Sequence, residues 1–198
     1  MKNITTLLFI LLVSCTRQSD SVSGQSDTNE TTLTTDNFDF TIKNGQIGNL
    51  KTGERLTDVL EKLKTLTVVL DSVPECEGCD TYSPLYVVAT FDNQDLFTFE
   101  PGWISTDRNK LYRILTSNER FITDKGIRVG MTVKDLKEKY EMDEVDLGGE
   151  TGIHVMVKGF RGSFGIEIPR TNSHTNDFWT INKENIPDTL KINEIIIL

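Results

Sequence analysis

Two stretches of the chain, residues 50–63 and 127–140, share one pattern of hydrophobic and polar positions. They align without gaps at an offset of 77, and a glycine, an aspartate, a glutamate and a lysine recur at matching positions. In each stretch the apolar residues recur at positions i, i+3 and i+7, the spacing of one face of a short amphipathic helix. Gly53 or Gly130 precedes that helix, where a tight or left-handed turn costs glycine least.

The second stretch has the stronger helix start. Thr132 can cap the helix, and Asp135 at the third helical position completes a variant of the capping box. Met131 and Leu136 have the spacing of a hydrophobic staple around the same helix start. The pattern therefore predicts a short helix in each stretch, with the clearer start in the second.

Strand patterns follow each predicted helix in a similar order. Their apolar and polar residues alternate most clearly in 153–157 and 164–168, as in sheets with one buried face. This order predicts an α+β fold with two copies of a short helix packed on an antiparallel β-sheet, either two half-domains with a shared core or two small lobes. The copies span about 45–117 and about 118–198. Their predicted strands are 66–73, 85–91, 96–99 and 111–115 in the first copy, and 153–157, 164–168 and 192–198 in the second.

The N-terminal residues have the pattern of an export signal. Lys2 precedes an apolar run of ten residues, 4–13, which is too short to span roughly 30 Å of hydrocarbon. Leu12-Val13-Ser14-Cys15 resembles a bacterial lipobox, which implies that residues 1–14 are removed and that Cys15 is acylated. Two or three acyl chains, at about 0.8 kcal/mol per buried methylene, anchor a protein stably. The alternative is an ordinary or uncleaved signal with an incidental cysteine.

The lipobox resemblance implies a place in the bacterial cell envelope, anchored to a membrane through Cys15. We expect the outer membrane rather than the inner one, and the sequence leaves the periplasmic or surface face open. Residues 16–36 are polar, with only Val22 and Leu33 to bury, so we expect 15–36 to be the acylated cysteine and a disordered tether. From residue 37 the composition is globular, and 37–198 is expected to form the α+β domain.

The charge of the chain limits its partners. It has 21 basic and 30 acidic residues, a net charge of −9. Removing 1–14 takes away one lysine and gives 20 − 30 = −10. A nucleic-acid partner is not expected, because sequence-independent binding needs a basic face. Electrostatic docking on anionic lipid is disfavoured for the same reason, so the lipid anchor supplies the membrane attachment.

Three cysteines are present, and lipidation of Cys15 leaves Cys76 and Cys79. Their C-x-x-C spacing predicts a loop-closing disulfide or two unreactive thiols. A redox site needs a helix N-terminus to lower the pKa of the first thiol, and the sequence leads into a strand instead. A zinc site needs two more ligands, and only His154 and His174 exist, without paired spacing. We expect no metal and no cofactor.

Candidate chemistry elsewhere is weak. The acidic run 141–150 lacks the regular spacing of a calcium loop and is interpreted as a solvated loop between helix and strand. Ser163 lies in a predicted hairpin rather than in a nucleophile elbow. His154 is interpreted as a strand-face residue rather than a base, and His174 as a residue of a polar loop, with contact to a ligand as the alternative. No catalytic residue is predicted, and an enzyme would require a spatial constellation that the sequence cannot show.

Trp103 and Trp179 lie in equivalent loops, each before the closing strand of its copy, and Phe178 precedes the second. Aromatic residues in loops on a rigid sheet are typical anchors of binding surfaces. We therefore consider Trp103, Phe178 and Trp179 as partner-binding residues. The alternative is that each tryptophan folds back over its sheet edge.

Residues 126–140 are similar to a glycine-methionine-helix phrase of uncharacterised lipoproteins in the Bacteroidota, although Glu141 replaces the glycine that often follows the aromatic residue. More distantly, the repeated unit resembles the duplicated β-lactamase-inhibitor-protein fold and the outer-membrane assembly lipoprotein BamE. These resemblances imply a scaffold for protein contacts and carry over no catalytic residue. The expected function is a non-enzymatic envelope lipoprotein that binds another envelope protein. The alternatives are an inhibitor or immunity-type protein against a secreted enzyme, or a hydrolase with an unrecognised site.

Overall fold

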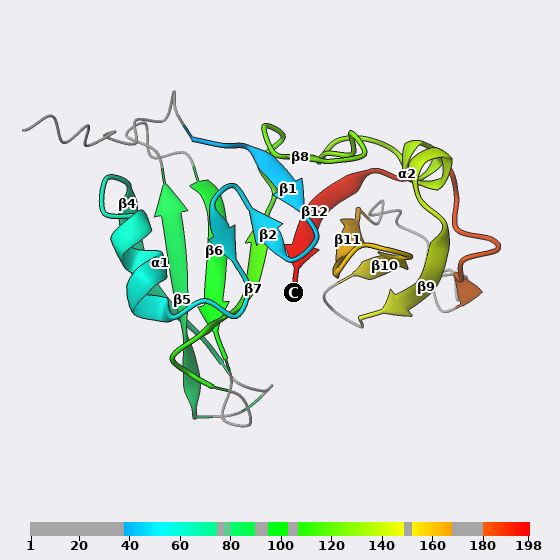
Figure 1. Ribbon diagram of the computed structural model, residues 1–198. Coiled ribbons are helices and arrows are strands. Elements are labelled where there is room, and N and C mark those ends of the chain that lie inside the picture. The colour runs from blue at the N-terminus through cyan, green and yellow to red at the C-terminus, as the bar shows by residue number, and fades with distance from the viewer. Residues whose placement is uncertain are drawn as a thin grey trace, which may run out of the picture. The chain divides into compact units, whose positions relative to one another are not determined.

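The computed structural model describes residues 38–74, 78, 80–89, 95–102, 107–148, 152–167 and 180–198 (Figure 1). These residues belong to one compact unit, 32–198. The signal segment, Cys15 and the tether lie outside the described residues. In the part of the chain that the structure describes, no helix has both the length and the apolar composition needed to cross a membrane.

The described elements are two short helices and twelve strands. The helices are α1 (Leu56–Lys62) and α2 (Val133–Lys139). The strands before α2 are β1 (Thr41–Lys43), β2 (Gln46–Ile47), β3 (Leu50–Lys51), β4 (Thr67–Pro74), β5 (Tyr82–Ala89), β6 (Asp95–Pro101), β7 (Leu111–Thr116) and β8 (Ile122–Thr123). The strands after it are β9 (Met142–Leu147), β10 (Ile153–Val157), β11 (Gly162–Ile166) and β12 (Ile192–Ile197).

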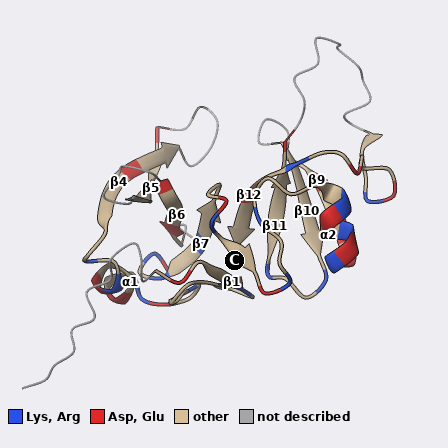
Figure 2. Ribbon diagram, turned by 90° about the horizontal axis from the view of Figure 1, so that it is seen from above, with Lys and Arg blue, Asp and Glu red and all other residues tan. Residues whose placement is uncertain are grey.

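Eight strands form one large sheet in the order β4-β5-β6-β7-β12-β11-β10-β9. Each half is an antiparallel meander, and the closing strands of the two halves, β7 and β12, pair antiparallel at the centre with Ile195 opposite Thr116. A small sheet of order β3-β2-β1-β8 contains one parallel pair, β1 with β8. Seen nearly along the strands, both helices and β1 lie on one side of the large sheet (Figure 2).

The expected fold class is wrong. Of the described residues, 48% lie in strands and 11% in helices, so the molecule is mostly β rather than two helix-on-sheet units. Each helix has only seven residues. The strands of the small sheet have two or three residues each, and so short a segment cannot display the alternation from which a strand is predicted.

The acidic run after α2 also differs from its interpretation as a solvated loop. Met142–Leu147 forms β9, the edge strand that pairs with β10. Its acidic residues Asp143, Glu144 and Asp146 are exposed. An edge strand with charged side chains resists pairing with another chain, and this explains why a strand can have a loop-like composition.

The two helix starts differ as the sequence predicts. The Thr132 hydroxyl accepts a hydrogen bond from the Asp135 N–H (3.2 Å), and the Asp135 carboxylate accepts one from the Thr132 N–H (2.8 Å), which completes the capping box. At the first helix Arg55 occupies the N-cap and makes no side-chain cap. Gly53 and Gly130 have φ of 87° and 88°, which confirms the left-handed turn expected before each helix.

Backbone hydrogen bonds repeat between the two halves. The N–H of Gly53 donates to the carbonyl of Leu111 (2.7 Å), and the N–H of Gly130 donates to the carbonyl of Ile192 (2.8 Å). The first helical residue of each half donates in the same way, Leu56 to Asn109 and Val133 to Leu190. Each glycine turn is therefore held against the residues that open the closing strand of its own half.

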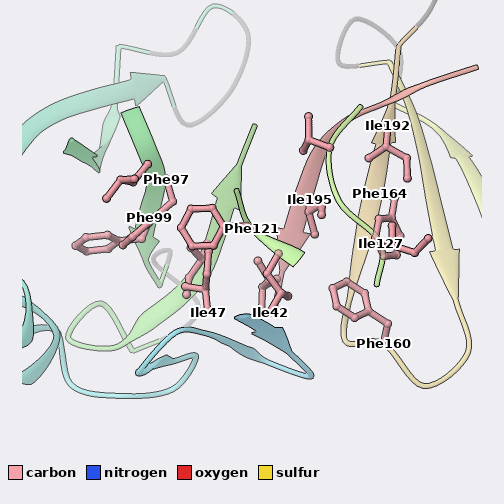
Figure 3. Packing of buried hydrophobic residues seen from close by; sticks show 14 of the residues in the cluster. Ile42, Ile47, Phe97, Phe99, Phe121, Ile127, Phe160, Phe164, Ile192 and Ile195 are labelled. Atoms are coloured by element: carbon pink, nitrogen blue, oxygen red, sulfur yellow. The ribbon is translucent and has the colours of Figure 1, made fainter. Parts of the chain in front are cut away.

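One hydrophobic cluster runs through both halves. Val59 of α1 and Leu136 of α2 belong to it, together with residues of both sheets. Figure 3 shows Ile42 and Ile47 of the small sheet among aromatic and isoleucine side chains of the large sheet. The helices and the small sheet thus share a core with one face of the large sheet. Burial of this apolar surface is the main stabilising contribution to the fold.

Candidate functional site: the open face of the large sheet

The second face of the large sheet is only partly buried. Along β10 the burial alternates, with Ile153, Val155 and Val157 in the core and His154 and Met156 partly exposed between them. The strand registers show which residues of the other seven strands lie on the same face of the sheet as His154 and Met156. We call this surface the open face. Its central residues are Val69, Leu85, Val87, Thr98, Glu100, Arg113, Leu115, His154, Met156, Ser163, Gly165, Glu194 and Ile196.

An ion pair between adjacent strands lies at the centre of the open face. The Arg113 Nε donates to Glu100 Oε2 (2.9 Å), and the Arg113 Nη2 donates to Glu100 Oε1 (2.8 Å). The Glu100 side chain is only 4% exposed, whereas that of Arg113 is 32% exposed. A two-point contact of this kind fixes both side chains and satisfies the buried carboxylate.

Glu194 of β12 is the other carboxylate in this region. Burial raises its pKa, and the nearby charges of His154 and Arg113 oppose that effect. Glu194 receives no hydrogen bond from any of the described residues. Because Arg113 is already engaged by Glu100, Glu194 is a partly buried acceptor to which no side chain of the described ranges donates.

A glycine separates Glu194 from His154. The register places Gly165 opposite both residues, Glu194 on one neighbouring strand and His154 on the other. A Cβ atom at Gly165 would lie 3.0 Å from Asn193 Oδ1 and 3.1 Å from Glu194 Cβ. The His154 Nδ1 is buried, and it has no hydrogen-bond partner within the described part of the chain. The close approach of Asn193 and Glu194 to this position therefore favours glycine there.

A groove of about 460 Å³ adjoins Glu194. Its lining residues include the partly exposed Leu115 and the polar residues Asp95, Thr98 and Asn118. Such a surface can accept a side chain with an apolar stem and a hydrogen-bond donor or cationic head, because an ionised Glu194 is an acceptor only.

The described residues show no metal-binding or nucleophilic centre. Nowhere in the described ranges do three His, Cys, Asp or Glu side chains gather closely enough to hold a metal ion. Ser163 and His154 lie on adjacent strands of the open face, but none of the hydrogen bonds of the described residues joins them. The geometry therefore provides no activated serine on this face.

Most of the residues singled out from the sequence lie outside the described residues. This applies to the lipidation residue, the two C-x-x-C cysteines, the loop aromatics and one histidine: Cys15, Cys76, Cys79, Trp103, Phe178, Trp179 and His174. Their roles remain predictions. Of the candidates, the structure places only Ser163 and His154, both on the open face.

Glu100, Arg113 and Glu194 are not among the candidates that the sequence offers. Each is a charged residue inside a strand that is otherwise largely apolar, in the segments Phe97–Pro101, Leu111–Leu115 and Ile192–Ile197. That signal is visible in the sequence. The long-range pairing of β7 with β12, which brings the three residues to one place, is not.

The arrangement defines the chain as a β-rich protein built on an eight-stranded antiparallel sheet with a helix before each half. One solved structure of similar fold is the crystal structure of the uncharacterized protein YfeY from Escherichia coli. It superimposes with a TM-score of 0.52, is 12% identical, and the match covers 79% of this chain and 98% of that chain. This likeness concerns the fold alone. No known protein family and no curated protein matches the sequence.

Proposed function

We propose that this chain is a lipid-anchored protein of the bacterial cell envelope whose domain binds another protein through the open face of its large sheet. Glu194 is the observation that carries the binding role. It is a partly buried carboxylate next to a groove, and no described residue donates a hydrogen bond to it. A donor on a docked partner can make a charge-assisted hydrogen bond to this carboxylate, and such bonds are stronger than neutral ones.

The chemistry of the groove indicates what the partner offers. An arginine or lysine of the partner fits best, because its aliphatic stem packs on the partly exposed Leu115 while its charged head reaches Glu194. Arginine is enriched at the energetic centres of protein interfaces. The neighbouring apolar residues Val87, Ile196 and Met156 are partly exposed and supply contact area around this centre.

The lipid anchor rests on the pattern that ends at Cys15. Replacement by Cys15→Ser is expected to abolish incorporation of an alkyne-labelled palmitate and to leave residues 1–14 attached, since lipobox processing requires the cysteine. Mass spectrometry of the N-terminus measures both effects. Undiminished labelling of the Cys15→Ser variant, or a wild-type chain without acyl groups, would contradict the anchor.

Photocrosslinking tests the binding surface in intact cells. A photoreactive phenylalanine analogue at Thr98 or Met156 of the open face is expected to capture the same partner. The analogue at Thr57 of α1 or Lys134 of α2, both exposed on the other side of the sheet, is expected to capture none. Capture from the helix positions with none from the open face would show that the surface is wrongly assigned.

A charge variant tests the central residue. Glu194→Lys is expected to reduce the crosslinking yield at Thr98 at least tenfold, because it places a like charge against the partner's cationic group. Glu138→Lys makes the same chemical change on the exposed surface of α2 and is the matched control. Equal yields from the two variants would remove Glu194 from the interface.

A further inference from the structure

The two edges of the large sheet differ in their protection. The β9 edge carries three exposed acidic side chains, Asp143, Glu144 and Asp146. The β4 edge has eight residues and a single charge, Asp71. Charged side chains keep another strand from adding to an edge, whereas a long apolar edge invites it. Of these two edges, the β4 edge is therefore the one suited to pairing with another strand.

The backbone of β4 shows which groups face outward. Ser72 lies opposite Pro84, which has no N–H, and the Ser72 N–H is bonded instead to the Asp71 carboxylate (2.8 Å). Ser72 and Pro84 therefore form a non-hydrogen-bonded pair, and the backbone groups of Ser72 point away from β5. Backbone groups alternate in direction along an antiparallel strand, so those of Val68, Leu70 and Pro74 also point away from β5.

Two of these four residues cannot donate a backbone hydrogen bond to another strand. Pro74 has no N–H to donate, and the Ser72 N–H is occupied by Asp71. The outward N–H groups that can donate to another strand are therefore those of Val68 and Leu70, two residues apart. The side chains of Val69 and Leu70 are also 52% and 64% exposed. The open part of the edge is thus short, apolar and centred on Val69.

We propose that β4 pairs antiparallel with β4 of a second copy of this chain, with Val69 opposite Val69 of that copy. In this register Val68 lies opposite Leu70 of the other copy, and vice versa. Both residues have outward backbone groups, so each such pair exchanges two hydrogen bonds. The exposed side chain of Leu70 then packs against Val68 across the junction, and the two Val69 side chains meet on the open face.

Self-complementarity favours a second copy of this chain as the occupant of the edge. The outward N–H groups of Val68 and Leu70 are placed symmetrically about Val69, so a twofold axis there gives both of them a partner in each copy. A register centred on Leu70 is poorer, because it places Val68 opposite Ser72, whose N–H is occupied. The acidic β9 edge prevents a second junction of the same kind, so the assembly closes as a dimer and does not extend into a filament.

The interface is small, and it belongs to the weak, transient class. It does not depend on the proposed partner of the open face, and the purified full-length chain without any partner is sufficient to test it. The dimer is expected to appear as the protein concentration is raised in analytical ultracentrifugation. Leu70→Lys is expected to weaken dimerisation at least tenfold, and Thr57→Lys, an equal charge change on the exposed surface of α1, to leave it unchanged.

Two cysteine variants test the register. Facing Val69 residues have Cα atoms about 4.5 Å apart, within disulfide range, so Val69→Cys is expected to form a covalent dimer under mild oxidation. In the same register the two Leu70 Cα atoms are roughly 8 Å apart, so Leu70→Cys is expected to give at least tenfold less. Mass spectrometry of the linked peptide separates this bond from bonds of the native cysteines.

The outcomes are distinct. A disulfide-linked peptide that joins position 69 of two Val69→Cys chains, together with dissociation by Leu70→Lys, supports the proposal. A chain that stays monomeric at the highest concentration reached, or equal crosslinking through positions 69 and 70, overturns it. Circular dichroism of each variant verifies that the fold is retained, so that loss of the dimer reflects the edge and not unfolding.

Discussion

Replacement of Arg113 by methionine is expected to destabilise the domain strongly. The change removes both hydrogen bonds to Glu100 and leaves its carboxylate 4% exposed and without a cation. At an effective dielectric constant of about 20 and a charge separation of about 4 Å, the lost attraction is about 4 kcal/mol. Breaking a buried pair in this way typically costs about 3–5 kcal/mol. Because Arg113 is partly exposed and its removal admits water, we expect a loss of about 3 kcal/mol in the free energy of unfolding.

Equilibrium unfolding in urea measures this quantity, with an unchanged m-value as the sign that only stability has altered. Lys62→Met is the matched control, because Lys62 makes a similarly short pair with Glu54 (2.7 Å) but both side chains are more accessible to water. Such a pair contributes about 0–1 kcal/mol. The double variant Glu100→Met with Arg113→Met removes both charges and is expected to recover most of the loss.

The expected loss depends on the burial of Glu100. If Arg113→Met costs no more than Lys62→Met, the Glu100 carboxylate is solvated and the ion pair is an ordinary surface pair. If the double variant is as unstable as Arg113→Met alone, the loss comes from packing of the arginine stem and not from an uncompensated charge.

Three further predictions concern helix starts, glycines and pH. Thr132→Ala is expected to cost about 1 kcal/mol in urea unfolding, while Arg55→Ala at the uncapped helix costs almost nothing. Gly159→Ala is expected to cost about 1–2 kcal/mol for its left-handed backbone, and Gly162→Ala more, because its Cβ would lie 1.9 Å from a carbonyl oxygen of β12; thermal unfolding compares the two. Burial raises the pKa of Glu194, so its ionised form costs folding energy above that pKa; Glu194→Gln is expected to be more stable than the wild type at pH 7, and the gap to close as the pH falls through the raised pKa to the ordinary carboxyl value. A gap that widens on acidification would contradict the last of these.

Local patterns in the sequence locate many of the elements. The capping box at Thr132 and Asp135 and the glycine turns before both helices are present as predicted. β10 covers the predicted segment 153–157, because alternation over five residues on a half-buried sheet is a strong local signal. These features depend on neighbouring residues only, so the sequence contains enough information to place them.

Other elements cannot be predicted in this way. The composition of β9 indicates a loop because its carboxylates mark an exposed edge, and an edge exists only once the rest of the sheet is known. The strands of the small sheet are too short for any periodicity. The predicted fold class is wrong for the same reasons, since two short helices have clear patterns while several of the strands have none.

In the candidate site, too, some features can be seen in the sequence and others depend on contacts between distant segments. Glu100, Arg113 and Glu194 are visible in the sequence only as charged residues in apolar strands. Their meeting requires that β7 and β12, 76 residues apart from Thr116 to Ile192, pair at the centre of the sheet. Non-local strand pairing is set by the packing of the whole core and not by the segments themselves.

Residues a few positions apart are enough to specify the two helix starts, the glycine turns, several strands and an N-terminal pattern that predicts a lipid anchor at Cys15. These features depend on the backbone conformation and the side-chain spacing of residues that are close in the sequence. Only the folded molecule shows that the two halves join in a single sheet. It also shows which side of that sheet is the open face, and that the β4 edge has few charged side chains. Those properties arise from contacts between distant segments, because burial against a shared core decides which side of each strand meets water.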